Sequence, residues 1–448
     1  PEYKNGKYET EDAYKNRLKS DFARTVQTLV NHIGKKPRVM VWPYGQFNDV
    51  AVQIARQAGM PHYFSLGEKI VNKVGDKHIG RLLLNAETDL NTVKNYLNGI
   101  DESKQIQRVL HVDLDYVYDA NKAQQAKNLD KLIERIYRYG VTTVYLQAFS
   151  DPDGDGVADA LYFPNKYLPV RDDIFGRIAW QLQTRAGVQV YAWMPVLAFD
   201  LRKNVKEAEY VIDSRTGKPS TKAYLRLSPY NKQNVEIIKS IYNDLSFYAK
   251  FNGILFHDDA FLTDFEGAEG NHAEGMVSPQ AKQKTQDLIQ LTHQLTDALK
   301  PYFLRGSYSL KTARNLYASV ITNPNAEEWL AQNLKTLTDN YDTTAIMAMP
   351  YMENEQPISQ KEAYQWFASL IENVKAQAPL EKVLFEFQAV NWRTQKPIPE
   401  SELIDWMTLL QKNHIYSYGY YPDNFLTNQP DMNKMKPYFS VNTNAGKQ

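Results

Sequence analysis

The sequence predicts an α/β protein whose larger part is a (β/α)₈ TIM-type barrel with long loops, preceded by a smaller α/β segment. From Val109 onward, short β-rich runs alternate with helical stretches in about eight strand–helix units. Many of these runs end in acidic or aromatic residues, and barrel enzymes gather their chemistry at the carboxyl ends of their strands. No glycine-rich phosphate turn follows the first run, which disfavours a doubly wound dinucleotide-binding sheet.

Apolar runs and helical periodicity predict the individual elements. Residues 1–100 predict a helix over Asp21–His32, a strand over Arg38–Trp42, a helix over Asp49–Ala58 and a strand near Tyr63–Phe64. Barrel strands are predicted at Val109–Tyr118, Thr143–Phe149, Val188–Phe199, Gly253–Phe261, Tyr302–Tyr308, Ala345–Tyr351, Lys382–Phe387 and Ile415–Tyr421. Helices are predicted at Gln124–Tyr139, Asn234–Tyr248, Pro279–Ala298, Glu327–Thr338, Lys361–Ala376 and Glu400–Lys412.

The composition limits the classes of partner and chemistry. Lysine plus arginine and aspartate plus glutamate both total 52, so no overall field attracts nucleic acid or an anionic membrane. Cysteine is absent, which excludes disulfides, thiolate metal sites and a cysteine nucleophile. A polar stretch at Asn95–Lys104 predicts a boundary between domains at residues 1–100 and 105–440.

The fourth run ends in a row of acidic residues. Phe256 is followed by His257, Asp258 and Asp259, with Asp264 soon after. On a continuing strand His257 and Asp259 would share one face and Asp258 would take the other. Because crowded carboxylates are costly to bury, at least one should have a raised pKa or a cationic partner, and glycosidic cleavage needs a proton-holding carboxyl beside an ionised one. The three aspartates are therefore candidate catalytic acids, although Asp258 could instead cap a helix or pair with a nearby lysine, and His257 could only orient an aspartate.

Two further runs carry acids at strand positions. Glu386 lies inside an apolar strand and is a fourth candidate catalytic acid, unless it forms a structural pair with an arginine or lysine. His111, Asp113 and Asp115 alternate along the first run and are expected to share one face near the barrel mouth. Asp115, nearest the end of the run, is expected to touch substrate, while Asp113 orients its neighbours.

Aromatic residues make up 12% of the chain, and sugar rings stack on aromatic side chains while their hydroxyls bind carboxylates. This composition makes carbohydrate binding a candidate function, with ordinary packing at half-buried positions left open as the alternative for each aromatic residue. The candidate substrate-binding residues are Asp115, Trp193, Tyr224, His257, Glu353 and Trp392.

The loop after the second run alternates aspartate with glycine. Its candidate metal ligands are Asp151, Asp153, Asp155 and Asp159, which resemble the first half of a calcium loop. Tyr162 stands where the bidentate glutamate of such a loop is expected. The loop is therefore either a calcium site or a solvated, glycine-shaped loop near the substrate groove.

Three segments, Val109–Asp119, Leu161–Asn165 and Phe256–Glu266, resemble the carboxy-terminal glycoside-hydrolase domain of the poly-N-acetylglucosamine (PNAG) deacetylases of biofilm-forming Gram-negative bacteria. The resemblance covers residues 105–440, whereas residues 1–100, with Arg38–Gly45, resemble the last part of the preceding polysaccharide-deacetylase domain. It implies site roles for Tyr224, His257, Asp258, Asp259, Asp264 and, beyond them, Glu386.

The resemblance also implies a substrate and a location. The substrate would be a partly deacetylated β-linked N-acetylglucosamine polymer, shortened by endo-hydrolysis at the periplasmic face of the outer membrane beside the export porin. A lipid anchor lost upstream of Pro1 would be the only attachment to the membrane. Independently of the resemblance, free glucosamine units are cations near neutral pH, so an acidic groove would favour them.

The hydrolase domain is expected to need no cofactor, whereas the deacetylases hold a divalent metal with an aspartate and two histidines close in sequence. No such set occurs before residue 100, where His32, His62 and His78 are scattered. Those ligands are expected upstream of Pro1, so this fragment is expected to lack deacetylase activity.

The hypothesis for the barrel is general-acid cleavage by Asp258, Asp259 or Asp264. A second carboxylate would act as a nucleophile at about 5 Å separation, or would orient a substrate acetamide that attacks in its place. The alternative is a non-catalytic PNAG-binding module that guides polymer to the exporter, since binding and hydrolysis use similar acids and aromatic residues.

Overall fold

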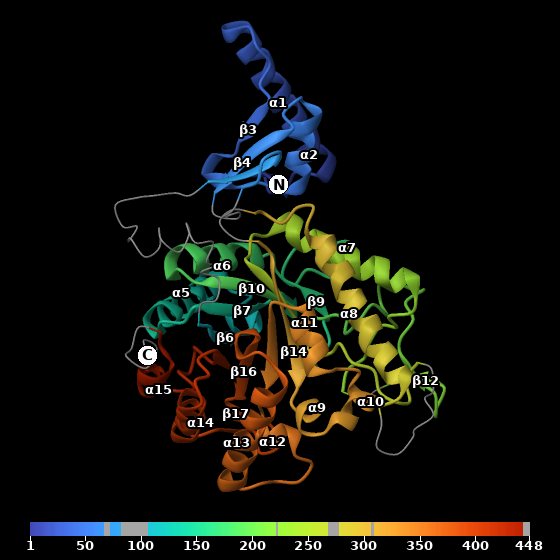
Figure 1. Cartoon of the computed structure of the whole chain (residues 1–448), viewed down its shortest axis with the longest axis vertical. Helices are drawn as coiled ribbons and strands as arrows, with labels where there is room; N and C mark the ends of the chain where they lie inside the picture. Colours follow the sequence, from blue (N-terminus) through green and yellow to red (C-terminus); the bar gives the residue numbers. More distant parts are fainter. Residues whose placement is uncertain (67–71, 82–105, 221–222, 268–276, 306–308, 442–448) are drawn as a thin grey trace. The chain divides into compact units, whose positions relative to one another are not determined.

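The computed structural model describes residues 1–66, 72–81, 106–220, 223–267, 277–305 and 309–441, and it divides into two compact units (Figure 1). The first unit comprises Pro1–Gln105 with Asn243–Lys250 and Asp297–Leu310. The second comprises Ile106–Tyr242, Phe251–Thr296 and Lys311–Gln448. No helix of the described residues is both long and apolar enough to cross a membrane.

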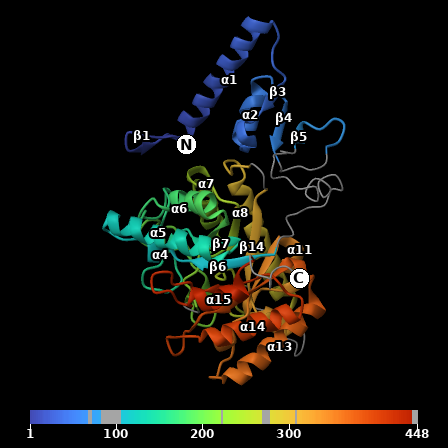
Figure 2. The same ribbon diagram turned by 90° about the vertical axis from the view of Figure 1, so that its left-hand side faces the viewer.

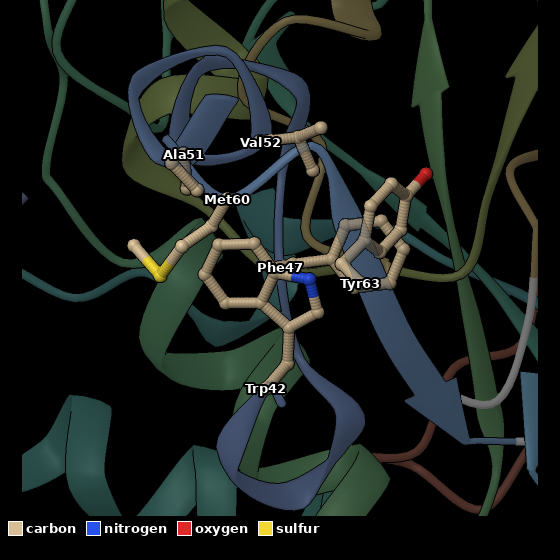
Figure 3. Packing of buried hydrophobic residues seen from close by; sticks show 7 residues of the cluster. Trp42, Phe47, Ala51, Val52, Met60 and Tyr63 are labelled. Carbon is tan, nitrogen blue, oxygen red and sulfur yellow. The ribbon is translucent and has the colours of Figure 1, made fainter. Parts of the chain in front are cut away.

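The first unit contains a parallel three-stranded sheet with two helices. The strands are β3 (Val39–Val41), β4 (His62–Leu66) and β5 (His78–Arg81), and the helices are α1 (Glu11–Ile33) and α2 (Asp49–Gln57). The short elements are β1 (Tyr3–Lys4), β2 (Lys7–Tyr8) and η1 (Pro43–Gly45). Trp42 stacks on Phe47 at 5.8 Å, and Phe47 meets the edge of Tyr63 at 5.2 Å in a small core (Figure 3). Helix α1 begins ahead of the predicted Asp21 because Thr10 caps it by accepting a hydrogen bond from the amide of Ala13.

The second unit contains a closed barrel of eight parallel strands, which confirms the predicted fold class. Strand β19 pairs with β6 and closes the ring. Because a parallel barrel is buried on both faces, most of its strands are apolar along their length. The strands in order are β6 (Arg108–Val112), β7 (Thr143–Gln147), β10 (Gln189–Met194), β13 (Gly253–Phe256), β14 (Lys311–Tyr317), β15 (Thr343–Met347), β16 (Val383–Gln388) and β19 (Tyr418–Tyr421).

Helices lie outside the strands of this unit (Figures 1 and 2). Their ends follow ordinary capping chemistry: Asn121 caps α5, and Ser359 forms a capping box with Glu362 at the start of α13. The helices are α5 (Lys122–Tyr139), α6 (Phe175–Gln181) with the π-helical turn η2 (Leu182–Ala186), α7 (Lys232–Tyr248), α8 (Pro279–Leu299), α10 (Glu327–Leu330), α11 (Leu334–Asn340), α13 (Gln360–Gln377), α14 (Glu400–Lys412) and α15 (Met432–Phe439).

Most of the remaining short elements lie in loops that follow the carboxyl ends of the strands, where a barrel carries its site. They are α4 (Leu114–Val117), β8 (Phe149–Ser150), β9 (Ala160–Leu161), β11 (Ile212–Asp213), β12 (Lys218–Pro219), α9 (Ser319–Thr322), η3 (Pro324–Ala326), α12 (Pro350–Glu353), β17 (Val390–Asn391) and β18 (Lys396–Pro397); η4 (Leu380–Lys382) precedes β16.

The fifth predicted strand was wrong. The sequence placed it at Tyr302–Tyr308, of which residues 306–308 lie outside the described part, but the fifth barrel strand is β14. Strand β14 contains Arg314 and Asn315, whose polarity hid it among loop residues. Arg314 donates to the hydroxyl of Tyr341 and to the carbonyl of Ala260, and Asn315 donates to Glu386. Both polar side chains therefore have hydrogen-bond partners inside the fold.

Two other element predictions need correction. The first run is a strand only to Val112 and then turns into α4, so Asp113 and Asp115 do not alternate along a strand with His111. The predicted helix over Glu327–Thr338 is two helices, because the left-handed backbone of Ala331 (φ 47°) separates α10 from α11.

Candidate active site at the barrel mouth

Acidic and aromatic side chains from several strand ends meet at the carboxyl end of the barrel. Burial and the charges of Asp113, Asp151 and Asp258 raise the pKa of the Tyr421 hydroxyl well above its usual value, so these three carboxyl groups lie around one tyrosine. We call them the acid cluster. The acid cluster and the side chains around it come from six places on the barrel: Asp113 after β6, Asp151 after β8, Trp193 in β10, Asp258 after β13, Tyr317 at the end of β14 and Tyr421 at the end of β19.

Asp258 accepts three side-chain contacts. His257 Nε2 lies 2.8 Å from Oδ1, while the hydroxyls of Tyr224 and Tyr317 donate to Oδ2 at 2.9 and 2.7 Å. Burial alone would raise the pKa of Asp258, but the charge of His257 and these hydrogen bonds lower it below its usual value. Asp258 is therefore ionised, and its field outweighs burial and raises the pKa of His257.

Asp113 has the opposite character. It is 7% exposed and follows β6 at the start of α4, where its side chain accepts a hydrogen bond from the hydroxyl of Tyr421. Burial, helped by the charges of Asp115 and Asp151, raises the pKa of Asp113 to about 8. Asp113 therefore holds a proton at neutral pH. The sequence had assigned it only an orienting role.

Asp115 is bound by protein groups. Its carboxylate accepts from Ser150 Oγ, the amide of Asp151, the hydroxyl of Tyr162 at 2.6 Å and Arg171 at 2.5 Å. Its contacts thus tie α4 to the loop that carries Asp151. The prediction that Asp115 touches substrate stays a prediction, and the contacts themselves show a residue that fixes the acid cluster.

Asp259 does not face the mouth as a free acid. Its two carboxylate oxygens accept from the consecutive amides of Val196, Leu197 and Ala198 at 2.6–3.0 Å, and the residue is fully buried. Burial raises the pKa of Asp259 against these bonds and the charge of His257. These contacts show that Asp259 anchors the loop after β10, and its catalytic role stays a prediction.

Asp264 is also separate from Asp258. It lies half-buried in a turn, and no hydrogen bond among the described residues joins it to His257, Asp258 or Asp259. Its negative charge acts instead on the cations Arg215 and Lys284. Its assignment as a catalytic acid has no support from these contacts.

Glu386 lies in the barrel interior rather than among the mouth acids. Its carboxylate is 2.7 Å from His111 Nε2 and 2.7 Å from Asn315 Nδ2, and these partners come from β6 and β14, which do not pair with β16. Such contacts must cross the inside of the barrel. Glu386 therefore belongs to an interior polar network, in which its partner is histidine rather than arginine or lysine. Its catalytic role stays a prediction.

Replacing Glu386 with alanine is expected to lower the free energy of unfolding of the barrel by about 2–5 kcal/mol, because His111 and Asn315 would lose a buried carboxylate partner. Glu386→Gln keeps the size and one acceptor, so its loss of stability should be smaller. Denaturant titrations of both variants check this. A Glu386→Ala variant as stable as the native protein would contradict the interior network.

The other predicted substrate residues occupy different depths. Trp193 is 5% exposed and packs between His257 and Tyr421 at 5.3 and 5.4 Å between ring centres, so it forms the floor of the site. Trp392 is half-buried, 6.2 Å from Tyr421. Glu353 instead accepts from the amides of Ala318 and Ser319, and burial raises its pKa to about 7. Glu353 therefore holds the start of α9, and its role in substrate binding stays a prediction.

The ring of Tyr224, whose hydroxyl donates to Asp258, packs directly against Gly156. A Cβ at Gly156 would lie 2.0 Å from the Tyr224 ring, and Gly156 has a left-handed backbone (φ +79°). Gly156→Ala is expected to displace Tyr224. For the polymer cleavage that the sequence leads us to expect, this should lower kcat/KM by about 100-fold, as small misplacements at a site do. The rate of reducing-end release measures this. Gly154→Ala is the matched control, because Gly154 has a similar φ (+75°) with nothing within 4 Å of its Cβ; equal losses would contradict the contact argument.

The aspartate loop brings together three of its four predicted ligands. Carboxylate oxygens of Asp151, Asp153 and Asp155 lie within 4.8 Å of one another, whereas Asp159 is not among them. Asp151 also accepts from the amides of Gly154, Asp155 and Gly156, and burial is the main cause that raises its pKa to about 6. Calcium binding at this loop stays a prediction.

The deacetylase metal does not fit the described part of the chain. There, the three loop aspartates form the only group of three or more histidine, cysteine, aspartate or glutamate residues with ligand atoms this close. An aspartate with two histidines is the donor set that the deacetylases use, and it is not formed. No chemistry of that metal is assigned to these residues.

Sequence reasoning missed Tyr317 and Tyr421 as site residues. Tyr421 ends the eighth predicted run, so the rule that searches strand ends could have found it. Tyr317 ends β14, the strand that the sequence misplaced. Asn315, the partner of Glu386, was lost with the same strand.

Known proteins resemble both parts of the chain. The family described as "Hypothetical glycosyl hydrolase family 13" matches residues 111–421, and the polysaccharide deacetylase family matches residues 7–63. The poly-β-1,6-N-acetyl-D-glucosamine N-deacetylases of Escherichia coli K12 and O157:H7 are 38% identical over 459 residues, covering 97% of this chain and 67% of their own length.

A solved structure resembles the barrel. The PgaB (BpsB) glycoside-hydrolase domain from Bordetella bronchiseptica superposes with a TM-score of 0.68 at 38% identity, covering 75% of this chain and 100% of that domain. The identity and coverage of these relatives, and the match of the hydrolase family to the barrel, show the relationship. The chain belongs to the PgaB family of poly-β-1,6-N-acetyl-D-glucosamine N-deacetylases and contains the glycoside-hydrolase barrel of that family.

Proposed function

We propose that the barrel is an endo-acting glycoside hydrolase that cleaves partially deacetylated poly-β-1,6-N-acetyl-D-glucosamine. The proposal depends on one observation: the pKa values of two buried carboxyl groups at the mouth are moved in opposite directions. Burial raises that of Asp113 to about 8, whereas the donors around Asp258 lower its pKa. A proton-holding acid beside an ionised carboxylate is the combination that glycosidic cleavage uses.

The proposed roles follow from these protonation states. Asp113 gives its proton to the glycosidic oxygen as the bond from that oxygen to C1 breaks, and the ionised Asp258 stabilises the cationic sugar. Water then adds to C1 and releases a proton, which restores Asp113. Asp258 acts either on C1 directly or by holding a substrate acetamide that attacks in its place.

Charge supports the choice of polymer. The acid cluster gathers three carboxyl groups at one mouth, while lysine plus arginine balance aspartate plus glutamate over the whole chain. Protonated glucosamine amines would concentrate at such a site, and fully acetylated chains would not. The Escherichia coli relatives are named for their action on this same polymer.

The deciding experiment is incubation of the protein with fully acetylated and with partially deacetylated polymer, followed by sizing of the products by mass spectrometry. We expect short oligomers and new reducing ends only from the partially deacetylated polymer, and their loss in Asp258→Asn. Affinity for glucosamine oligomers without new reducing ends would contradict hydrolysis. That result would establish the alternative, a binding module that guides polymer to an exporter.

We further propose a periplasmic location at the outer membrane, next to the porin that exports the shortened polymer. The Gram-negative sources of the relatives and their polymer support this. Fractionation of cells that express the gene from its own locus, with cross-linking to outer-membrane proteins, tests it. Recovery of the protein only in the cytoplasmic fraction would contradict the location.

A further inference from the structure

The two oxygens of Asp258 are unequally occupied. Oδ2 accepts from the hydroxyls of Tyr224 and Tyr317, at 2.9 and 2.7 Å, while Oδ1 lies 2.8 Å from His257 Nε2. An ionised carboxylate offers about two acceptor positions on each oxygen. Both positions of Oδ2 are therefore filled by protein donors, and Oδ1 keeps one position that no side chain among the described residues occupies.

We propose that Tyr317 is a positioning residue for the hydrolase: with Tyr224 it fills the acceptor positions of Asp258 Oδ2 and leaves one position on Oδ1 for an N–H or ammonium group of the substrate. This inference rests on the proposed function of the barrel. Tyr317 acts through Asp258 and needs no contact with the sugar itself. It thereby fixes both the direction of the carboxylate and the number of substrate donors that the carboxylate can take.

The fold holds Tyr317 in place on both sides. Its own amide donates to Gln332 Oε1 at 3.0 Å, and the amides of the next two residues, Ala318 and Ser319, donate to Glu353. Its ring meets Phe261 edge-on with ring centres 6.0 Å apart. The hydroxyl is therefore delivered to Asp258 by an anchored strand end, which is what a positioning role requires.

The charged and titratable groups around Asp258 come from several elements. His257 and Asp259 lie on its own segment, and the tyrosines at 224, 317 and 421 come from the loop after β10, from β14 and from β19. Asp151, after β8, acts on His257. Of these groups, the two tyrosines on Oδ2 and His257 favour the ionised form of Asp258. Removing one hydroxyl should therefore raise the pKa of Asp258.

Tyr317→Phe tests the inference because it keeps the ring and removes only the donor. Loss of the hydroxyl removes one hydrogen bond that favours the ionised form of Asp258. We therefore expect the acidic limb of the pH profile of kcat/KM to move to higher pH by about one unit. Tyr230→Phe is the matched control. Tyr230 donates to Asp287 Oδ2 at 3.1 Å, a tyrosine–aspartate pair on the exposed surface, so its profile should be unchanged.

Tyr224→Phe provides a second variant, since it removes the other donor to the same oxygen and should move the limb in the same direction. Calorimetric binding of glucosamine oligomers as a function of pH separates this inference from the proposed function. If the native protein binds but does not cleave, hydrolysis is refuted, and the pH dependence of binding still tests Tyr317. Unchanged pH dependence of both binding and cleavage in Tyr317→Phe would overturn the inference.

Discussion

Replacing Asp113 with asparagine is expected to lower kcat/KM for partially deacetylated polymer by about 10²–10⁴-fold, the range that a positioned general acid contributes. Asparagine has nearly the same shape and still accepts a hydrogen bond from Tyr421, but it holds no acidic proton for the leaving oxygen. The affinity for glucosamine oligomers should change far less than the rate. Initial rates of reducing-end release, with calorimetric affinities for short oligomers, measure both quantities.

The pH profile adds a second test of Asp113. Donation requires its protonated form, so the rate should fall as pH rises through about 8, while the requirement for ionised Asp258 sets an acidic limb below the usual aspartate range. Asp113→Asn should remove the basic limb from the residual activity. Asp287→Asn, at a half-buried position where the carboxylate accepts from Tyr230 and from none of the acid-cluster residues, should keep both limbs. A basic limb that persists in Asp113→Asn would assign it to another group.

The same shift makes stability depend on pH with a definite sign. Between the usual aspartate pKa of 3.8 and about 8, the folded protein holds a proton on Asp113 that the unfolded chain has lost. The folded state therefore binds more protons, and stability falls as pH rises through this window. In Asp113→Asn this part of the pH dependence should disappear.

Periodicity carried most of the fold prediction. Seven of the eight predicted runs overlap a barrel strand, because strands of a parallel barrel are apolar along their length and stand out from the helices between them. Strand β14 escaped because its polar side chains are matched by partners far along the chain, such as Tyr341 for Arg314 and Glu386 for Asn315. Long-range partners of this kind leave no local pattern.

The sequence predicted where the candidate site lies, but not which role each acidic residue has. Counting strands located Asp258 at a mouth, yet which acid holds a proton depends on burial and donors that only the fold assembles. Burial opposes ionisation of Asp258, but the charge and hydrogen bond of His257 and the hydroxyls of two tyrosines from other segments lower its pKa. Burial is the main cause that raises the pKa of Asp113. The neighbours Asp258 and Asp259 differ in the same way: Asp258 accepts from side chains at the mouth, whereas Asp259 accepts from main-chain amides. Only the fold determines these partners.

Replacing Asp259 with alanine is expected to lower the free energy of unfolding by at least about 3 kcal/mol. Three consecutive buried amides, at Val196, Leu197 and Ala198, would lose their acceptor, and each unpaired buried donor costs about 1–3 kcal/mol. Denaturant unfolding followed by tryptophan fluorescence measures the loss. Asp259→Asn retains one carbonyl oxygen for these donors, so its loss should lie between those of alanine and the native residue.

Asp264→Ala is the control, because Asp264 is half-buried in a turn and accepts no hydrogen bond from the amides after β10. Its stability should stay within about 0.5 kcal/mol of the native protein, as for surface changes away from such features. If Asp259 were instead a catalytic acid, Asp259→Asn would lose turnover while remaining as stable as the native protein. If Asp259 anchors the loop, as its contacts indicate, Asp259→Asn should instead lower the stability. Its activity should then fall only to the extent that the loop after β10 moves away from Asp258.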